Sequence, residues 1–363
     1  MADDQLREAS PLQRIDEDEP FRLTPDMPPE IASPLAAFKG APPASPAWFD
    51  EAIAKAPERS FVTVGGVRIE LLTWGERGKP GLIFVHGNSA HADWWSFIAP
   101  FFAADYRVAA LSLSGMGASD WRETYSFDIF AEEIFACATA AGLYEAAAKP
   151  VYIGHSFGGA QVLNSAIRHP ERMSACILVD TGFGGPPTPE EFEAMRKEAE
   201  AKGEDLGRWQ RLSQRSGRNR IYPTLEAALT RFRFMPPQVP GNLYIADFIA
   251  RRSLKRAPLE GEGGGEGWTW RFDPGVWAKL DRSGMGSLQV GPDTAPLVHI
   301  YGDHSEIIRR HSFQGKDGSR IPAAVPTIVI PDSEHHIMVD QPLALVAALR
   351  ALLATWAPRG AAA

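Results

Sequence analysis

The chain has 363 residues, of which 44% are hydrophobic and 23% are charged, so it can bury a substantial core in one large domain or two smaller ones. Its formal net charge of −8 argues against binding along a nucleic-acid backbone, which requires a clustered basic face. No run approaches the roughly 18 apolar residues of a membrane span. The acidic N-terminus also lacks the apolar segment of a signal peptide, so we expect a cytoplasmic protein without a membrane span.

The predicted elements begin after a proline- and alanine-rich extension, residues 1–55, expected to lie over the surface or to be partly mobile and to end in a short helix at 46–55. Strands 61–64 and 67–74 flank Gly65-Gly66, which predicts a β-hairpin. Apolar runs typical of buried parallel strands follow at 82–85, 108–113, 151–153, 175–179, 297–301 and 324–330. Segments of helical period separate them at 95–104, 127–141, 160–168 and 342–356. This alternation predicts an α/β fold with a mostly parallel, doubly wound sheet.

One interval, residues 182–286, breaks the alternation. It is charged and aromatic, has helical segments such as 189–202, and contains no series of buried strands. We therefore predict a helical cap, or lid, inserted between two parts of the core, 56–181 and 287–363, with a flexible glycine-rich turn at 261–267.

A sequence with the pattern G-x-S-x-G lies at residues 154–159 (GHSFGG), between an apolar strand and a helix start rich in small residues. This strand–turn–helix context is what a nucleophile elbow requires, because only glycine fits beside so sharp a turn. The pattern alone could also be a structural turn, but its context favours Ser156 as a nucleophile. At a helix N-terminus the free N–H groups favour developing negative charge.

Two further loops supply partners for this serine. Residues 86–88 (HGN) end an apolar strand, and we predict that the backbone N–H groups of Asn88 and Phe157 form an oxyanion hole, with His86 shaping the loop. Residues 331–336 (PDSEHH) follow the last predicted strand. The length of this loop favours His335 as the general base. A histidine suits this role because its near-neutral pKa lets it accept and return the serine proton. His336 would line the pocket or cap the following helix.

These blocks, in this order, resemble the α/β-hydrolase superfamily over most of residues 61–363. Residues 112–120 (SLSGMGASD) resemble its D-L-P-G-x-G-x-S-D loop, with Ser112 and Ser114 departing from it, and residues 340–342 (DQP) resemble the D/E-x-P that starts its last helix. The resemblance implies an esterase-like, capped serine hydrolase. Relatives that dehalogenate or open epoxides hold aspartate at the elbow, so Ser156 argues against both chemistries.

The acid of the triad is not determined by this resemblance. The family commonly places it three residues after the glycine that ends the seventh strand, where this chain has Ser305. Asp180, at the end of the sixth strand, and Glu306, one residue late, stand level as substitutes, and Asp303 ranks third. Loss of the acid would lower the rate about 10⁴-fold.

Together these features predict a serine hydrolase that cleaves a carboxylic ester, thioester or lactone of a small, largely apolar molecule through an acyl-Ser156 intermediate. C–C bond hydrolysis on the same triad is one alternative, and a non-catalytic receptor that kept the fold is another, supported by Ser305. We expect no metal and no organic cofactor, and Cys137 and Cys176 have no metal-ligand spacing. The oligomeric state stays open. The residues expected to line the pocket are Trp94, Trp95, His155 and His336.

Overall fold

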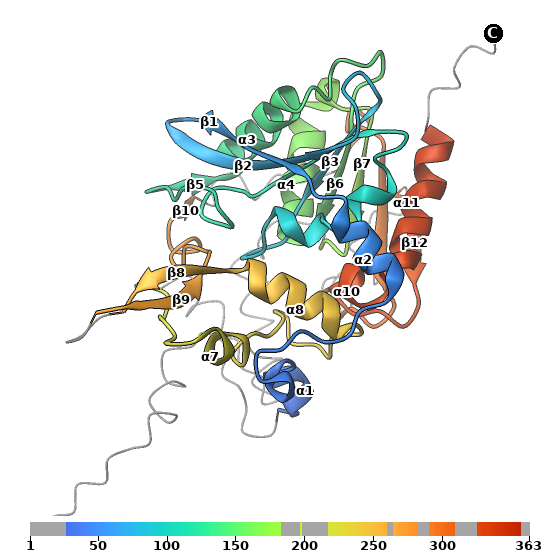
Figure 1. Cartoon of the computed structure of the whole chain (residues 1–363). Coiled ribbons are helices and arrows are strands. Elements are labelled where there is room, and N and C mark those ends of the chain that lie inside the picture. Colours follow the sequence, from blue (N-terminus) through green and yellow to red (C-terminus); the bar gives the residue numbers. More distant parts are fainter. Residues whose placement is uncertain are drawn as a thin grey trace, which may run out of the picture.

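The predicted alternation of strands and helices produces one mixed sheet of eight strands, in the order β1-β2-β4-β3-β6-β7-β11-β12 (Figure 1). The computed structural model describes residues 27–182, 197, 217–259, 264–281, 290–308 and 325–356. The strands of this sheet are β1 (Glu58–Val64), β2 (Val67–Trp74), β3 (Gly81–Val85), β4 (Arg107–Leu111), β6 (Val151–His155), β7 (Ala175–Val179), β11 (Leu297–Gly302) and β12 (Thr327–Ile330). Strand β2 pairs antiparallel with β1 and β4, and all other pairs are parallel, so the predicted mostly parallel sheet is confirmed.

The β1–β2 hairpin turns at Gly65 and Gly66, as predicted. Both glycines have positive φ, 54° and 81°, a combination that suits a two-residue turn and that side chains with a Cβ rarely adopt.

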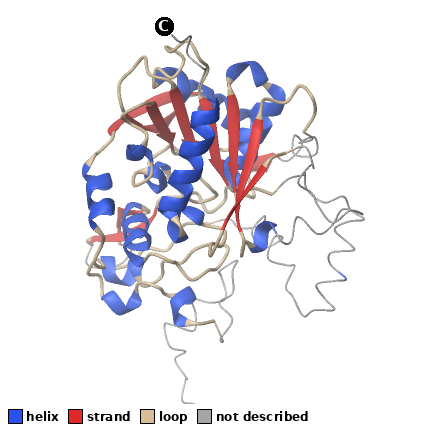
Figure 2. Cartoon of the chain, turned by 90° about the vertical axis from the view of Figure 1, so that its right-hand side faces the viewer, coloured by secondary structure: helices blue, strands red, loops and turns tan. Residues whose placement is uncertain are grey.

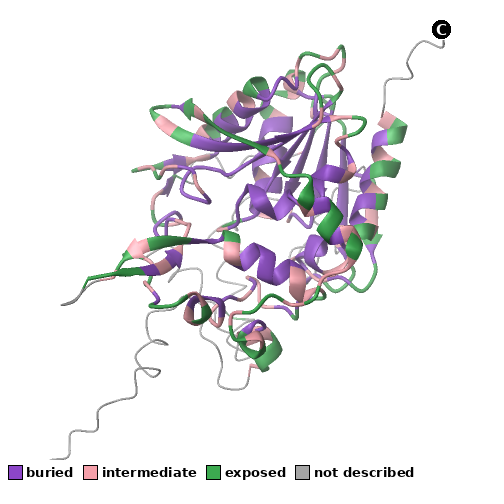
Figure 3. Cartoon of the chain, in the orientation of Figure 1, coloured by how far each residue is buried: buried purple, intermediate pink, exposed green. Residues whose placement is uncertain are grey.

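Helices cover both faces of the sheet, which confirms the doubly wound architecture (Figure 2). Successive strand residues alternate between two apolar clusters, so that Leu82 and Phe84 face one side while Ile83 and Val85 face the other. The second side is covered by α3 (Phe127–Ala140) and α4 (Phe157–Arg168). The first is covered by the helices η3 (Ala92–Trp95), η4 (Ala99–Phe101), α10 (Ile337–Asp340) and α11 (Pro342–Trp356). The central strands are buried almost throughout (Figure 3).

One predicted helix is wrong. Residues 95–104 do not form a continuous helix but contain the end of η3 and then η4, two short 3₁₀ segments. Pro100 lies in the first turn of η4, where its missing N–H is tolerated, but it cannot occupy the interior of a longer helix.

The segment predicted to be an inserted helical cap, called the cap from here on, also contains strands. Its described residues form α7 (Leu225–Leu229), α8 (Leu243–Arg252) and an antiparallel hairpin of β8 (Leu254–Pro258) and β9 (Glu266–Trp270). Strand β10 (Leu280–Asp281) pairs with the core's β5 (Tyr125–Ser126). In β9, the buried residues Gly267 and Thr269 alternate with the half-buried residues Trp268 and Trp270, which is the period of a strand. Because these residues are small, polar or aromatic, they do not form the apolar run by which the strands of the main sheet were predicted. The predicted helix at 189–202 and the cap's boundary at 286 lie outside the described residues, apart from residue 197.

The described part of the N-terminal extension packs against the cap. It contains α1 (Pro29–Ala32), η2 (Ala36–Phe38) and α2 (Ala47–Ala54), the last matching the helix predicted at 46–55. Phe49 of α2 is 3% exposed, and its ring lies 4.9 Å from Tyr244 and 5.6 Å from Phe248 of α8. Arg251 of α8 donates a hydrogen bond of 2.6 Å to the Gly40 carbonyl. Because the Phe49 ring also lies 5.8 Å from that of Phe97 in the core, this segment joins the cap to the core.

Candidate active site

Ser156 lies at a sharp turn between β6 and α4. Its φ of 52° and ψ of −117° are far from the usual regions for a residue with a side chain, and such strain is found mostly where function needs it. Two glycines make the turn possible: a Cβ on Gly154 would lie 2.6 Å from the Gly158 carbonyl oxygen, and a Cβ on Gly158 would lie 2.6 Å from that of Val85 and would also strike that of His86. The turn places Ser156 at the N-terminus of α4.

Replacing Gly158 by alanine is expected to destabilise the protein by about 1–3 kcal/mol, because backbone at the end of β3 must move to admit the methyl group. The same movement displaces the loop beside Ser156, so any reaction of the Ser156 hydroxyl should slow about 100-fold. Denaturant unfolding and the rate of covalent labelling of Ser156 measure the two effects. Gly291→Ala is the matched control, since a Cβ there meets nothing within 4 Å and its φ is not positive. Equal stability of the two variants would contradict this account of the turn.

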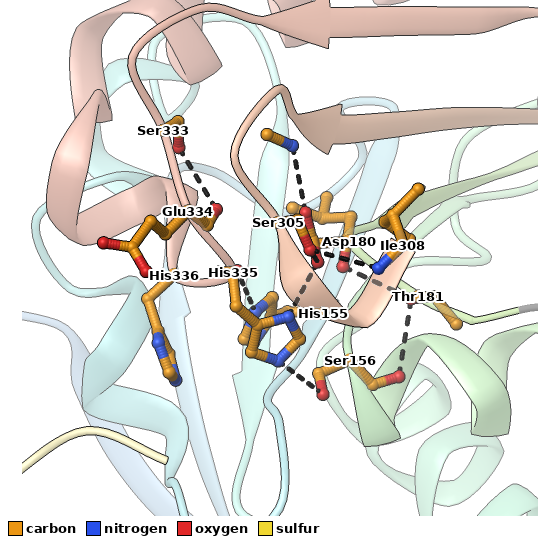
Figure 4. Close-up of polar contacts among 12 residues, drawn as sticks. His155, Ser156, Asp180, Thr181, Ser305, Ile308, Ser333, Glu334, His335 and His336 are labelled. Carbon is orange, nitrogen blue, oxygen red and sulfur yellow. Dashed lines mark hydrogen bonds and ion pairs between the residues drawn. The ribbon is translucent and has the colours of Figure 1, made fainter. Parts of the chain in front are cut away.

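His335 follows β12 and faces Ser156 directly (Figure 4). Its Nε2 lies 2.9 Å from the Ser156 Oγ, and its Nδ1 lies 2.7 Å from Oδ1 of Asp180. Because a carboxylate only accepts, Nδ1 carries the proton, and Nε2 is left to accept the hydroxyl proton of Ser156. His335 is 3% exposed, so little water competes for these bonds.

Of the three carboxylates considered from the sequence, the structure brings Asp180 to His335. Asp180 is fully buried, and its Oδ1 also accepts the Ser305 hydroxyl at 2.6 Å, while its Oδ2 accepts the Gly302 N–H at 2.9 Å. Glu306 was a wrong candidate. It is exposed, and the residue of this loop that contacts the Asp180 carboxylate is Ser305. Asp303 is also exposed and accepts the Ser333 N–H at 3.1 Å.

The loop after β3 lies against the nucleophile, as an oxyanion loop must. A Cβ on Gly87 would be 3.4 Å from the Ser156 Cβ, and Asn88 follows on the exposed side of the loop. The Phe157 N–H belongs to the first turn of α4, where the helix itself supplies no acceptor. The N–H groups of Asn88 and Phe157 therefore stay the predicted donors to an oxyanion at Ser156.

His86 shapes this loop. Its Nε2 accepts the Leu113 N–H at 3.0 Å, so its Nδ1 carries the proton and donates to the Gly87 carbonyl at 2.7 Å. Burial lowers the pKa of His86 to about 3, which keeps the ring neutral. It therefore contributes to the loop's geometry and not to proton transfer.

The four residues expected to line the pocket have different environments. Trp94 is buried beside the rings of Phe234 at 5.8 Å and His336 at 5.6 Å. Trp95 is fully buried against Phe84 of β3, at 4.8 Å, so its assignment to the pocket was wrong and it belongs to the core.

The two histidines support the catalytic loop. His155 donates from Nε2 to the His335 carbonyl at 3.0 Å, and both the N–H and Nδ1 of His336 meet Oε1 of Gln238. Burial, which is the largest cause, and the nearby His335 hold the pKa of both rings well below the usual value, so both are neutral. His335 is thus flanked by neutral imidazoles. Within the described residues, no group of three or more His, Cys, Asp or Glu side chains could hold a metal ion.

Two supporting residues were not predicted from the sequence. Gln238 comes from the cap and gives no sequence signal, because its partners lie about 100 positions away. Ser305 was noticed as a departure from the usual acid position, but its contact with Asp180 depends on which strands are neighbours in the sheet.

This geometry agrees with comparisons to known proteins. A model of the alpha/beta hydrolase family matches residues 82–349, which is most of the chain. The chain belongs to the alpha/beta hydrolase family. The relatives include esterases and epoxide hydrolases, and as a member the chain is a hydrolase.

Individual relatives are more distant. Esterase Rv0045c of Mycobacterium tuberculosis is 26% identical over 320 residues, covering 82% of this chain and 90% of the relative. Epoxide hydrolase 4 of Homo sapiens is 32% identical over 118 residues, and the match spans only 32% of either protein. Among solved structures, the M. tuberculosis esterase has a TM-score of 0.55 at 20% identity over 88% of this chain and 97% of its own. E-2-(Acetamidomethylene)succinate hydrolase has a TM-score of 0.58 at 16% identity over 82% of this chain and 99% of its own, a likeness of fold.

Among the described residues, no helix combines the length and apolar character that crossing a membrane requires.

Proposed function

We propose that this hydrolase cleaves a carboxylic ester, thioester or lactone through a covalent acyl-Ser156 intermediate. The observation that carries the proposal is the unbroken hydrogen-bonded series from the Ser156 Oγ through the His335 ring to Asp180, with distances of 2.9 and 2.7 Å. A nucleophile, a base and an acid that orients the base in this arrangement are what acyl transfer requires.

In the first half of the reaction, the Ser156 Oγ attacks the substrate carbonyl carbon while its proton passes to Nε2 of His335. The Phe157 and Asn88 N–H groups receive the oxyanion of the tetrahedral intermediate. His335 then gives the proton to the leaving alcohol or thiol as the carbonyl–heteroatom bond breaks. In the second half, His335 deprotonates a water that attacks the acyl carbon, and the returned proton restores the Ser156 hydroxyl.

Asp180 has two roles in these steps. Its Oδ1 fixes the proton of His335 on Nδ1, which directs Nε2 toward the serine, and its negative charge stabilises the imidazolium that forms. The Ser305 hydroxyl and the Gly302 N–H hold this buried carboxylate in place.

Other functions have less support. Epoxide opening in the related family requires an aspartate at the elbow, where this chain has Ser156. The receptor alternative depended on the missing acid at Ser305, and the contact between Asp180 and His335 removes that argument. C–C bond hydrolysis would use the same residues with a different leaving group. A largely apolar substrate is supported by the aromatic rings of Trp94 and Phe234 and the neutral His336 near the base.

The test is covalent labelling with an alkyl fluorophosphonate, followed by intact-mass and peptide mass spectrometry. We expect one adduct per folded chain, on Ser156, and none on Ser156→Ala or on heat-unfolded protein, because only an activated serine reacts. Circular dichroism verifies that the alanine variant is folded. Folded wild-type protein that stays unlabelled would refute the proposal and favour a ligand-binding protein.

A further inference from the structure

The backbone on both sides of His335 is held by side chains from outside its loop. The Glu334 N–H donates to Oδ2 of Asp340 at 2.9 Å, and the His336 N–H donates to Oε1 of Gln238 at 3.0 Å. The same Gln238 donates from Nε2 to both carboxylate oxygens of Asp340, at 3.1 and 2.9 Å. We call these hydrogen bonds the Gln238 bridge. They close a ring of interactions around the residue that carries the base.

Gln238 belongs to the cap, in the segment between α7 and α8, whereas all its partners in the bridge belong to the core. Its residue is 2% exposed, so solvent does not substitute for the bonds that it makes. The orientation of its amide is determined by chemistry: the carboxylate of Asp340 requires the NH₂ group, and the His336 N–H requires the oxygen. No other rotation of the amide satisfies both partners.

The side chain of His336 strengthens this connection. Its Nδ1 also meets Oε1 of Gln238, and its ring lies 4.9 Å from that of Phe234, a second residue of the same cap segment. Because His336 is neutral and Oε1 can only accept, Nδ1 is the donor. The cap therefore contacts the residue next to the base through two hydrogen bonds and an aromatic ring.

We propose that Gln238 is a positioning residue through which the cap aligns His335 with Ser156. This inference rests on the proposed function. Without the bridge, the His336 N–H loses its acceptor and Asp340 loses a donor, so the peptide units beside His335 are less constrained. A displacement of the Nε2–Oγ geometry by as little as about 1 Å lowers the rate about 100-fold. In this way the cap contributes to the chemical step.

The test compares Gln238→Met, which keeps the volume but removes the bridge, with Asn242→Ala. Asn242 is a matched control, because it also joins the cap to the core, donating to the Val339 and Asp340 carbonyls at 2.8 and 3.1 Å, but it does not touch the residues beside His335. The readouts are the second-order rate of fluorophosphonate labelling, kcat and KM for a p-nitrophenyl ester, and the melting temperature. Gln238→Ala is measured in parallel, so that a packing defect of the methionine variant is recognised.

We expect both Gln238 variants to lower the labelling rate and kcat by about 10- to 100-fold with KM changed less than about 3-fold, because ground-state binding is retained. Asn242→Ala should keep kcat within about 3-fold of wild type, even if its melting temperature falls as much as that of the Gln238 variants. A loss confined to KM, or equal kcat in the Gln238 and Asn242 variants, would overturn the inference. Labelling of the wild-type protein distinguishes failure of the proposed function from failure of this inference. If wild-type Ser156 is not labelled, the proposed function is wrong. If it is labelled, the variants test only the role of Gln238.

Discussion

Replacing Ser156 by alanine is expected to lower kcat for a p-nitrophenyl ester by about 10⁶-fold, and replacing His335 by alanine should cost nearly as much. The two side chains act as one unit, since the Ser156 hydroxyl is a weak nucleophile unless Nε2, 2.9 Å away, removes its proton. The double variant should therefore be no slower than either single variant. Steady-state kinetics on all three proteins measures this non-additivity.

Ser333→Ala is the control for changes in the His335 loop. The Ser333 hydroxyl lies two residues before the base and donates to the Glu334 carbonyl at 3.3 Å without contacting Ser156 or Asp180. Its removal should leave kcat within about 3-fold, as is usual for a site away from the reacting groups. If the losses of kcat in Ser156→Ala and His335→Ala instead multiply in the double variant of these two residues, Ser156 and His335 do not act in one step.

The second large effect concerns the acid. Asp180→Asn should lower kcat by about 10⁴-fold, because an amide NH₂ facing Nδ1 favours the wrong tautomer of His335 and provides no negative charge for the imidazolium. The variant should fold, since the amide keeps the shape of the carboxylate and an oxygen for the Ser305 hydroxyl or the Gly302 N–H. Steady-state kinetics and fluorophosphonate labelling should both show the loss.

Glu306→Gln is the matched comparison, because it makes the same chemical change one residue beyond Ser305 on an exposed side chain. We expect its kcat to stay within about 2-fold of wild type. The reverse ranking, with Glu306→Gln slow and Asp180→Asn active, would assign the acid to Glu306 and require a different arrangement of the loop after β11.

The parts of the site that could be predicted from the sequence are those determined by local geometry. The elbow around Ser156 requires glycines within two residues, and the base follows directly from the last apolar strand, so both motifs are contiguous. The strands themselves were recognisable because buried parallel strands are continuous apolar runs, and the helix at 342–356 matches α11 along its whole length.

The acid depends instead on the pairing of distant strands. Asp180 directly follows β7 and Ser305 follows β11, 125 positions later, and their side chains meet because these two strands are neighbours in the sheet. Asp180 also has a left-handed φ of 46°, a conformation that could not be predicted from the sequence. Glu306 is one residue from the usual position and yet is exposed, which depends on the backbone path after β11.

The cap was the least predictable region for a related reason. Its hairpin of β8 and β9 packs polar and aromatic residues on a small surface, so the usual apolar alternation is weak. Trp94 and Trp95 are adjacent in sequence, but one faces His336 and the other the sheet, and composition does not distinguish them. Gln238 could not be found because its two partners, His336 and Asp340, lie about 100 positions later in the chain.

The packing of α2 on α8 has a consequence for where the chain can be trimmed. A chain shortened to begin at Glu58 would keep Ser156, Asp180 and His335 and every strand of the main sheet. It would nevertheless lose the Phe49 ring, which lies 4.9 Å from that of Tyr244 and 5.6 Å from that of Phe248, so part of an apolar surface on α8 would be exposed to water. We therefore expect the shortened protein to be less soluble than the full chain, although it keeps all three residues of the triad.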